Sequence, residues 1–150
     1  MNVHSNRIFS RSQNIVVDTS VWSLFLRREK RDESNRYVQQ LRKHLDQDDC
    51  IHLPGVVLQE LLDGVLHEKH FDLLLNYLKP FPLLDFTRMD FVFAAQLKNK
   101  CRSKGVQAGS VDFLIAATCI NRSYPLLTAD KDFEYIARHC DLVTITDVRV

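Results

Sequence analysis

Four carboxylates stand in short apolar or hydroxyl-containing contexts, where acids are more typical of chemistry than of an exposed surface. Asp18 follows the apolar run IVV, and Asp130 follows PLLTA. Glu60 lies in VVLQELLDG and Asp112 lies in GSVDFLIAAT. These positions are close to strand ends and helix starts, where parallel α/β proteins gather their site residues. The residue types therefore predict a site for a divalent cation.

Carboxylates gathered at one edge of a sheet would repel one another. Two unit charges about 5 Å apart repel by roughly 3 kcal/mol at an effective dielectric constant near 20. Without a cation, some of four such groups would bind protons. Mg²⁺ or Mn²⁺, which prefer oxygen ligands, would remove this repulsion and keep water molecules for chemistry. We therefore expect Mg²⁺ or Mn²⁺ at Asp18, Glu60, Asp112 and Asp130.

Each acid also has an ordinary structural interpretation, which the sequence leaves open. Asp18 and Asp130 could cap the helices that follow them, because Asp is a preferred N-cap residue. Asp112 is expected in the first turn of a helix, where the helix dipole favours an ionised carboxylate. Glu60 could be an exposed glutamate on a helix whose neighbours form the core. Asp132, two residues after Asp130, could be its outer partner.

Alternating strands and helices are expected to position these acids. Short apolar runs predict strands at 15–18, 50–53, 81–86, 124–128 and 142–145. Apolar residues at helical spacing predict helices near 20–26, 33–47, 54–64, 71–78, 91–104, 111–120 and 131–138. Thr19 or Ser20 is expected to cap the first helix, and Ser110 the one at 111–120. This alternation predicts an α/β fold, a mainly parallel sheet with helices on both faces.

Length and composition fit one globular domain. A chain of 150 residues buries about two-thirds of its unfolded surface. No apolar run approaches the roughly 18 residues of a membrane helix, and residues 1–14 lack the apolar stretch of a signal peptide. We therefore expect a polar N-terminal tail at 1–14, one domain at 15–150, no membrane association and a cytoplasmic location. The tail could also be a basic arm that contacts nucleic acid or a partner.

The cysteines are widely separated and show no spacing typical of a zinc site. They are Cys50, Cys101, Cys119 and Cys140. Three of them fall beside apolar residues, where a free thiol behaves as a small buried hydrophobe. We expect free thiols, which agrees with a reducing compartment.

Two basic runs have two interpretations each. One run contains Arg27, Arg28, Lys30 and Arg31, and the other contains Lys98, Lys100, Arg102 and Lys104. The net charge of +1 argues against a protein coated for nonspecific nucleic-acid binding. Each run is either a solvated helix face or a contact to a phosphate backbone.

Three segments resemble the PIN-domain ribonucleases, and among them the VapC-type toxins of toxin–antitoxin pairs. The segments are VVDTSVW around Asp18, LQELLDG around Glu60, and DFLIAATCINRSYPLLTADKDF from Asp112 to Phe133, the most specific of the three. The likeness spans about residues 15–145. It implies a three-layer α/β/α sandwich with a central, mainly parallel sheet of about five strands. The long tail and the pair Gly109–Ser110 depart from the usual pattern.

The resemblance also implies an activity, metal-dependent cleavage of RNA phosphodiester bonds that leaves a 5′-phosphate and a 3′-hydroxyl. Asp18, Asp112 and Asp130 would contact the metal directly or through water, and Glu60 would bind it and also orient the attacking water. The hydroxyls of Thr128 and Ser110 would hold the acids in place.

The partners implied by the resemblance are a tRNA or rRNA substrate, a cognate antitoxin whose peptide enters the acidic groove, and a second copy in a homodimer. An antitoxin arginine could pair with the carboxylates. Trp22 and Phe25 are candidates for antitoxin contact, and burial in the core is their alternative.

Two other functions compete with a nuclease. An aspartyl-phosphate phosphatase or receiver domain also has an Asp after its first strand, but the phosphatase signature needs a second Asp where this chain has Ser20. A noncatalytic PIN-like module that binds RNA or protein is the second alternative. The filled acidic positions argue against it, because a degenerate site could lose these charges and escape their repulsion.

Overall fold

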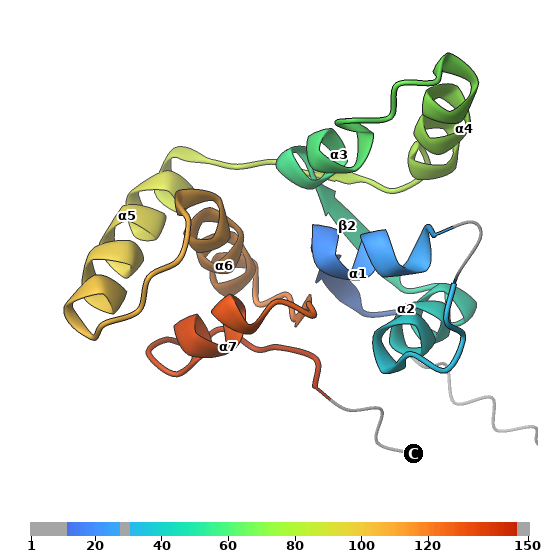
Figure 1. Cartoon of the computed structure of the whole chain (residues 1–150). Helices are drawn as coiled ribbons and strands as arrows, with labels where there is room; N and C mark the ends of the chain where they lie inside the picture. Colours follow the sequence, from blue (N-terminus) through green and yellow to red (C-terminus); the bar gives the residue numbers. More distant parts are fainter. Residues whose placement is uncertain (1–11, 28–30, 147–150) are drawn as a thin grey trace, which may run out of the picture.

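The computed structural model describes residues 12–27 and 31–146 (Figure 1). The strands are β1 (Asn14–Val17), β2 (Cys50–Pro54), β3 (Leu83–Leu84) and β4 (Leu126–Leu127). The helices are α1 (Thr19–Phe25), α2 (Arg36–Asp46), α3 (Gly55–Leu62), α4 (Glu68–Leu78), α5 (Arg88–Ser103), α6 (Ser110–Arg122) and α7 (Lys131–Ala137). Within the described residues, no helix has the length and apolar character needed to cross a membrane.

The expected tail falls mostly outside the part of the chain that the structure describes. Residues 1–11 are not described, and residue 14, the last one assigned to the tail, already belongs to β1. Arg28 and Lys30 of the first basic run also lie outside the described residues.

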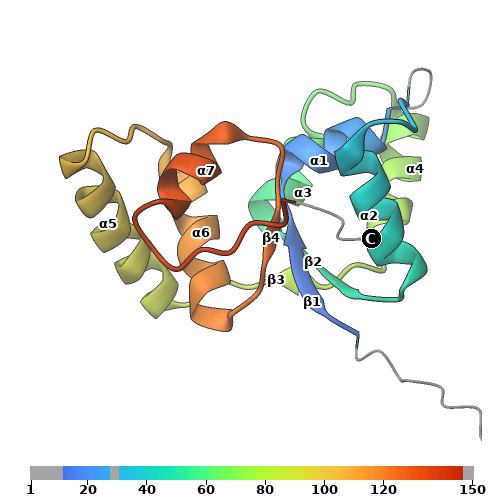
Figure 2. The same cartoon turned by 90° about the horizontal axis from the view of Figure 1, so that it is seen from below.

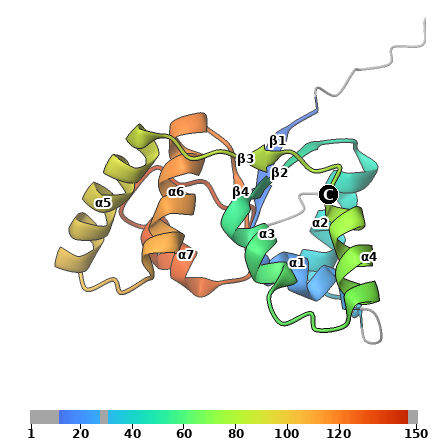
Figure 3. The same ribbon diagram turned by 90° about the horizontal axis from the view of Figure 1, so that it is seen from above.

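A parallel sheet in the order β3-β2-β1-β4 forms the middle layer. β1 pairs with β2 in the register Ile15↔Ile51 and with β4 in the register Val17↔Leu127. Both faces of β1 are covered, which is why its run of β-branched residues has no polar alternation. Helices α1 to α4 lie on one side of the sheet and α5 to α7 on the other (Figures 2 and 3). The predicted α/β/α arrangement is confirmed.

The described sheet has four strands, and the prediction of about five was wrong by one. Residues 142–145 form only a single parallel bridge, Leu126↔Thr144. Leu126 donates to the Val143 carbonyl and accepts from the Ile145 N–H, each at 2.9 Å. Both bonds use the backbone groups of Leu126, so the contact stays a bridge and is not a fifth strand.

The structure selects one of the caps predicted for α1 and moves the predicted cap of α6 by one residue. Asp18 caps α1, because its carboxylate accepts from the Ser20 N–H at 3.2 Å. Gly109 precedes α6, and its N–H donates to the Asp112 carboxylate at 3.3 Å. Ser110 is instead the first helical residue, and its hydroxyl accepts from the Lys98 ammonium at 2.7 Å. Short polar side chains in a row leave such one-residue choices open in the sequence.

The core contains the aromatic side chains of α1. Trp22 is fully buried and Phe25 is 5% exposed, so core burial is the outcome for both. Edge-to-face contacts join Trp22 to Phe25 and to Phe81, with ring centroids 6.4 and 5.1 Å apart. The cysteines are free thiols; Cys101 and Cys119 are buried among apolar residues, as expected.

A buried polar network joins the start of α5 to the end of α6. The Asp90 carboxylate is 1% exposed and accepts from the Asn121 amide at 2.8 Å and from the Arg122 guanidinium at 3.1 Å. It also accepts from the Thr87 N–H, and Arg122 reaches the Asp85 carbonyl at 2.6 Å. Burial acts to raise the pKa of Asp90, but these donors outweigh it and hold the pKa below its ordinary value.

Replacing Asp90 with Ala should lower the free energy of unfolding by about 2 kcal/mol, because the exposed Asn121 and the half-buried Arg122 lose the carboxylate that accepts from both. Urea denaturation at pH 7 measures this change. Asp85→Ala is the control, since only the backbone of Asp85 takes part in the network. Equal stability of the two variants would contradict the prediction.

Candidate metal centre

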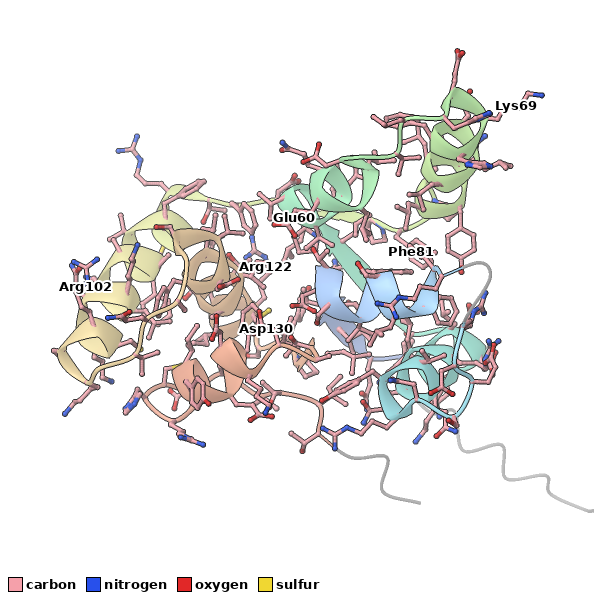
Figure 4. The ribbon with its side chains drawn as sticks, in the orientation of Figure 1. Glu60, Lys69, Phe81, Arg102, Arg122 and Asp130 are labelled. Atoms are coloured by element: carbon pink, nitrogen blue, oxygen red, sulfur yellow. The ribbon has the colours of Figure 1, made fainter. Side chains whose placement is uncertain are left out.

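The four predicted acids lie around the carboxyl edge of the sheet. Asp18 directly follows β1 and Asp130 comes just after β4, so two paired parallel strands deliver both acids to the same edge. Asp112 lies in the first turn of α6 and Glu60 in α3. Figure 4 shows Glu60 and Asp130 in the middle of the view, between the helices of the two outer layers.

Asp112, Asp130 and Asp132 form a compact group of acids. One carboxylate oxygen of each lies within 4.8 Å of the others, and all three residues are half-buried. Burial raises the pKa of Asp112, against the hydrogen bond from the Gly109 N–H. The negative charges of Asp130, Asp132 and Glu60 raise it further. The sequence predicts Asp132 only as an outer partner, whereas the structure places its carboxylate inside the group.

Asp18 lies deeper than the other acids and has its own set of donors. It is 6% exposed, and its Oδ1 accepts from the Ser20 hydroxyl at 2.5 Å. Its Oδ2 accepts from the Thr128 hydroxyl at 3.0 Å. Burial nevertheless raises the pKa of Asp18 to about 6, and the charge of Asp130 contributes to the rise. Asp18 is therefore both the helix cap that the sequence left open and an electrostatic neighbour of the acidic group.

Two hydroxyls tie the junction after β1 to the junction after β4. The Ser20 hydroxyl accepts from the Ala129 N–H at 2.9 Å, and the Thr128 hydroxyl accepts from the Asp130 N–H at 3.0 Å. Each hydroxyl also donates to Asp18, so both acids are held by one network. Thr128 is a predicted supporting residue, but Ser20 is predicted only as a cap. Its position two residues after Asp18, typical of an Asx-turn, was the available signal.

Glu60 belongs to helix α3 and does not follow a strand. It is exposed on α3, and its carboxylate accepts a hydrogen bond from the Thr19 hydroxyl at the start of α1. Its charge contributes to the raised pKa of Asp112. Pairwise electrostatic interactions therefore connect Glu60 to Asp112, Asp112 to Asp130, and Asp130 to Asp18. Within the described residues, the group of acids close enough to share an ion contains Asp112 and Asp130 of the four predicted acids, and Asp18 and Glu60 lie outside it.

The donor atoms of this site fit a hard divalent cation. They are carboxylate oxygens, the ligands that Mg²⁺ and Mn²⁺ prefer. The raised pKa values of Asp18 and Asp112 reflect a cost of ionisation, and a bound cation would reduce this cost. Asp112, Asp130 and Asp132 are the residues best placed to share such an ion.

Comparison with known proteins agrees with this arrangement. Residues 15–139 match the family model of the PIN domain. The chain belongs to the PIN domain family. The predicted resemblance is thereby confirmed, and the matched range spans the positions of the four predicted acids.

Several solved structures share the fold of this PIN domain. VapBC2 from Rickettsia felis, bound to a DNA fragment from its promoter, is 22% identical, with a TM-score of 0.71 and coverage of 89% of this chain and 98% of the other. FitAcB from Neisseria gonorrhoeae is 23% identical, with a TM-score of 0.67 and coverage of 88% and 96%. A toxin–antitoxin complex from Klebsiella pneumoniae is 16% identical, with a TM-score of 0.59 and coverage of 79% and 89%.

The raised pKa of Asp18 predicts how metal-free protein responds to pH. The folded state binds a proton on Asp18 with a pKa of about 6, against 3.8 for an unperturbed Asp. Stability therefore falls as the pH rises from about 4 to about 6, by up to about 3 kcal/mol. Asp18→Asn cannot ionise, so in EDTA it should be more stable than the parent at pH 7.5 but not at pH 4.

Urea denaturation at the two pH values measures the difference between Asp18→Asn and the parent. Asp46→Asn, an exposed change on α2, is the control and should show no such dependence on pH. A variant that is less stable than the parent at pH 7.5 in EDTA would show that ionised Asp18 is not destabilising.

Proposed function

We propose that this PIN domain is a Mg²⁺- or Mn²⁺-dependent endoribonuclease and the toxin of a toxin–antitoxin pair. The observation that carries the proposal is the grouping of Asp112, Asp130 and Asp132 within 4.8 Å, with Asp18 and Glu60 coupled to it. Such a cluster is unfavourable without a cation, and a cation held by carboxylates suits phosphodiester hydrolysis.

The acids have three roles in this proposal. Asp112, Asp130 and Asp132 hold the cation, which lowers the pKa of bound water and stabilises charge on the phosphate. Asp18 supports the group from its buried position beside Asp130. Glu60 is exposed, and the Thr19 hydroxyl orients it to position the attacking water and accept its proton. The water oxygen would bond to phosphorus as the P–O3′ bond breaks, and the leaving O3′ would take a proton from solvent, which leaves a 5′-phosphate and a 3′-hydroxyl.

Asp112→Asn and Asp130→Asn should each lower the cleavage rate by at least about 100-fold, because each removes a charge that holds the cation. A structured RNA with labelled ends, incubated with Mn²⁺, measures cleavage by purified protein. Mn²⁺ affinity from isothermal titration calorimetry should fall in the same variants. Circular dichroism checks that both fold.

Asp46→Asn is the matched control for these two variants, since Asp46 is exposed on α2. It should cleave at the parental rate. Parental cleavage by Asp112→Asn and Asp130→Asn would remove both acids from the mechanism. RNA binding without any cutting by the parent protein would favour the noncatalytic module instead. Sequencing of RNA 5′ ends after induction in cells identifies the target.

A groove that none of the acids lines supports the proposal of an antitoxin partner. It has a volume of about 690 Å³ and lies between the α1–α2 pair and α4. Its lining is largely apolar, with Phe25, Leu73 and Tyr77, and carries the cations Arg31 and Arg42. Leu73 is 53% exposed on α4. Both arginines already pair with Glu33, so the feature of the groove that suits an amphipathic peptide is its apolar surface.

Leu73→Arg should weaken binding of the antitoxin by at least about tenfold, because it places a charge in the apolar groove. The small protein that co-purifies with the chain from its host is the test partner, and surface plasmon resonance measures its affinity. RNA cleavage by the variant should stay at the parental level, since none of the acids lines the groove that contains Leu73. Unchanged affinity would place the antitoxin elsewhere. Glu68→Arg, a change of charge at the start of the same helix, is the control.

A further inference from the structure

Helix α5 exposes apolar side chains in its first two turns, beside a groove that it forms with α6. Met89 is 75% exposed, Phe91 is 54% exposed and Val92 is 53% exposed. The inner side of the same helix is also apolar, because Ala94 and Leu97 belong to the core. A surface helix normally has one apolar side and one polar side. A second apolar side that faces outward is typical of a contact with another molecule.

The groove between α5 and α6 is apolar at the end that contains Phe91. It has a volume of about 390 Å³, and Val111 of α6, 39% exposed, contributes apolar surface to it. The ring of Phe91 packs edge-to-face against Phe86, with centroids 6.1 Å apart, which restrains its position. Because this ring is held in place before binding, a partner side chain would pack on it at a smaller entropic cost.

The end of the groove that contains Arg102 is cationic. Lys98 and Arg102 are charged, and none of the described residues that line the groove carries a carboxylate. The Lys98 ammonium donates to the Ser110 hydroxyl at 2.7 Å, which fixes it between α5 and α6. Arg102 is exposed on α5 (Figure 4). Within residues 12–27 and 31–146, no ion pair involves Lys98 or Arg102, so both are available to an anionic group.

We propose that this groove binds an amphipathic helix of a partner protein, with apolar side chains against Phe91 and Val111 and a carboxylate against Lys98 and Arg102. From Phe91 to Arg102, α5 rises about 16 Å, the length of a guest helix of about 11 residues. Its apolar side chains recur one turn apart, as in other helices that bind in grooves. The carboxylate then pairs with the Arg102 guanidinium by two parallel hydrogen bonds.

The lining of the groove favours such a helix over RNA or a second copy of this chain. RNA carries a phosphate at every nucleotide, whereas the two cations occupy one end of the groove and aliphatic side chains line most of the rest. Bases stack on aromatic rings, and Phe91 is the exposed ring among the described lining residues. A second copy would present the same two cations and, from this groove, no carboxylate to pair with them.

Selection of phage-displayed random peptides of about 16 residues on the parent protein tests the proposal. Phe91→Glu protein serves as the counter-selection that removes peptides bound elsewhere, because the new charge lies in the apolar end of the groove. Enriched peptides should carry apolar residues at helical spacing with Asp or Glu near one end. Enrichment of neutral or basic peptides, or of no class at all, would overturn the proposal.

Isothermal titration calorimetry of the most enriched peptide measures the two ends of the groove separately. Lys98→Ala/Arg102→Ala should weaken binding at least about tenfold, because the peptide carboxylate loses both of its cations. Phe91→Ala should also weaken it at least about tenfold. Lys43→Ala/Lys69→Ala is the matched control, since it removes two exposed lysines from α2 and α4 and should leave the affinity unchanged. Parental affinity in Lys98→Ala/Arg102→Ala would contradict the proposed charge pairing.

Photo-crosslinking decides the matter if a groove variant does not fold. The enriched peptide, with benzoylphenylalanine at one of its apolar positions, should label a fragment of the parent protein that contains Phe91 or Val111 in mass spectrometry. Labels confined to other fragments would overturn the proposal.

The two competing occupants have their own measurements. Sedimentation velocity reports a second copy, and fluorescence anisotropy with a labelled single-stranded RNA reports nucleic acid. Loss of a parental dimer or of parental RNA affinity in Phe91→Ala would assign the groove to that occupant and overturn the proposal. None of these measurements uses RNA cleavage, so the proposed nuclease function is tested separately.

Discussion

Mutual repulsion among carboxylates is the constraint on which the rest of this structure depends. Burial and neighbouring negative charges raise the pKa of Asp18 and Asp112, so the fold holds these groups at an electrostatic cost. At separations near 5 Å, each ionised pair costs roughly 3 kcal/mol. A protein gains nothing in stability from such an arrangement. In the proposed function, its value lies in the cation that it would hold.

The sheet and its helices hold the acids in position against this repulsion. Because β1 and β4 are paired and parallel, their carboxyl ends bring Asp18 and Asp130 together. The hydroxyls of Ser20 and Thr128 then link the two junctions through hydrogen bonds of 2.5 to 3.0 Å. The network around Asp90 clamps α5 to α6, the helix that carries Asp112. Hydrogen bonds near the acids and helix packing farther away therefore both position the carboxylates.

The two grooves lie in different layers of the molecule. The larger one lies among α1, α2 and α4, and the smaller one between α5 and α6, on the other side of the sheet. In the proposed function, the first receives the antitoxin. None of the acids lines it, so antitoxin binding and cleavage are separable by mutation.

The sequence by itself determined the alternation of strands and helices, the parallel sheet and the positions of the four acids, because hydrophobic period and local residue type carry this information. Only the tertiary structure decided that Asp132 joins Asp112 and Asp130, that Thr19 and Ser20 act as donors, and that residues 142–145 form a single bridge. These outcomes depend on distances between segments far apart in the chain and on the short length of β4. The hydrophobic pattern of a single segment predicts neither the distances to other segments nor where a short strand ends.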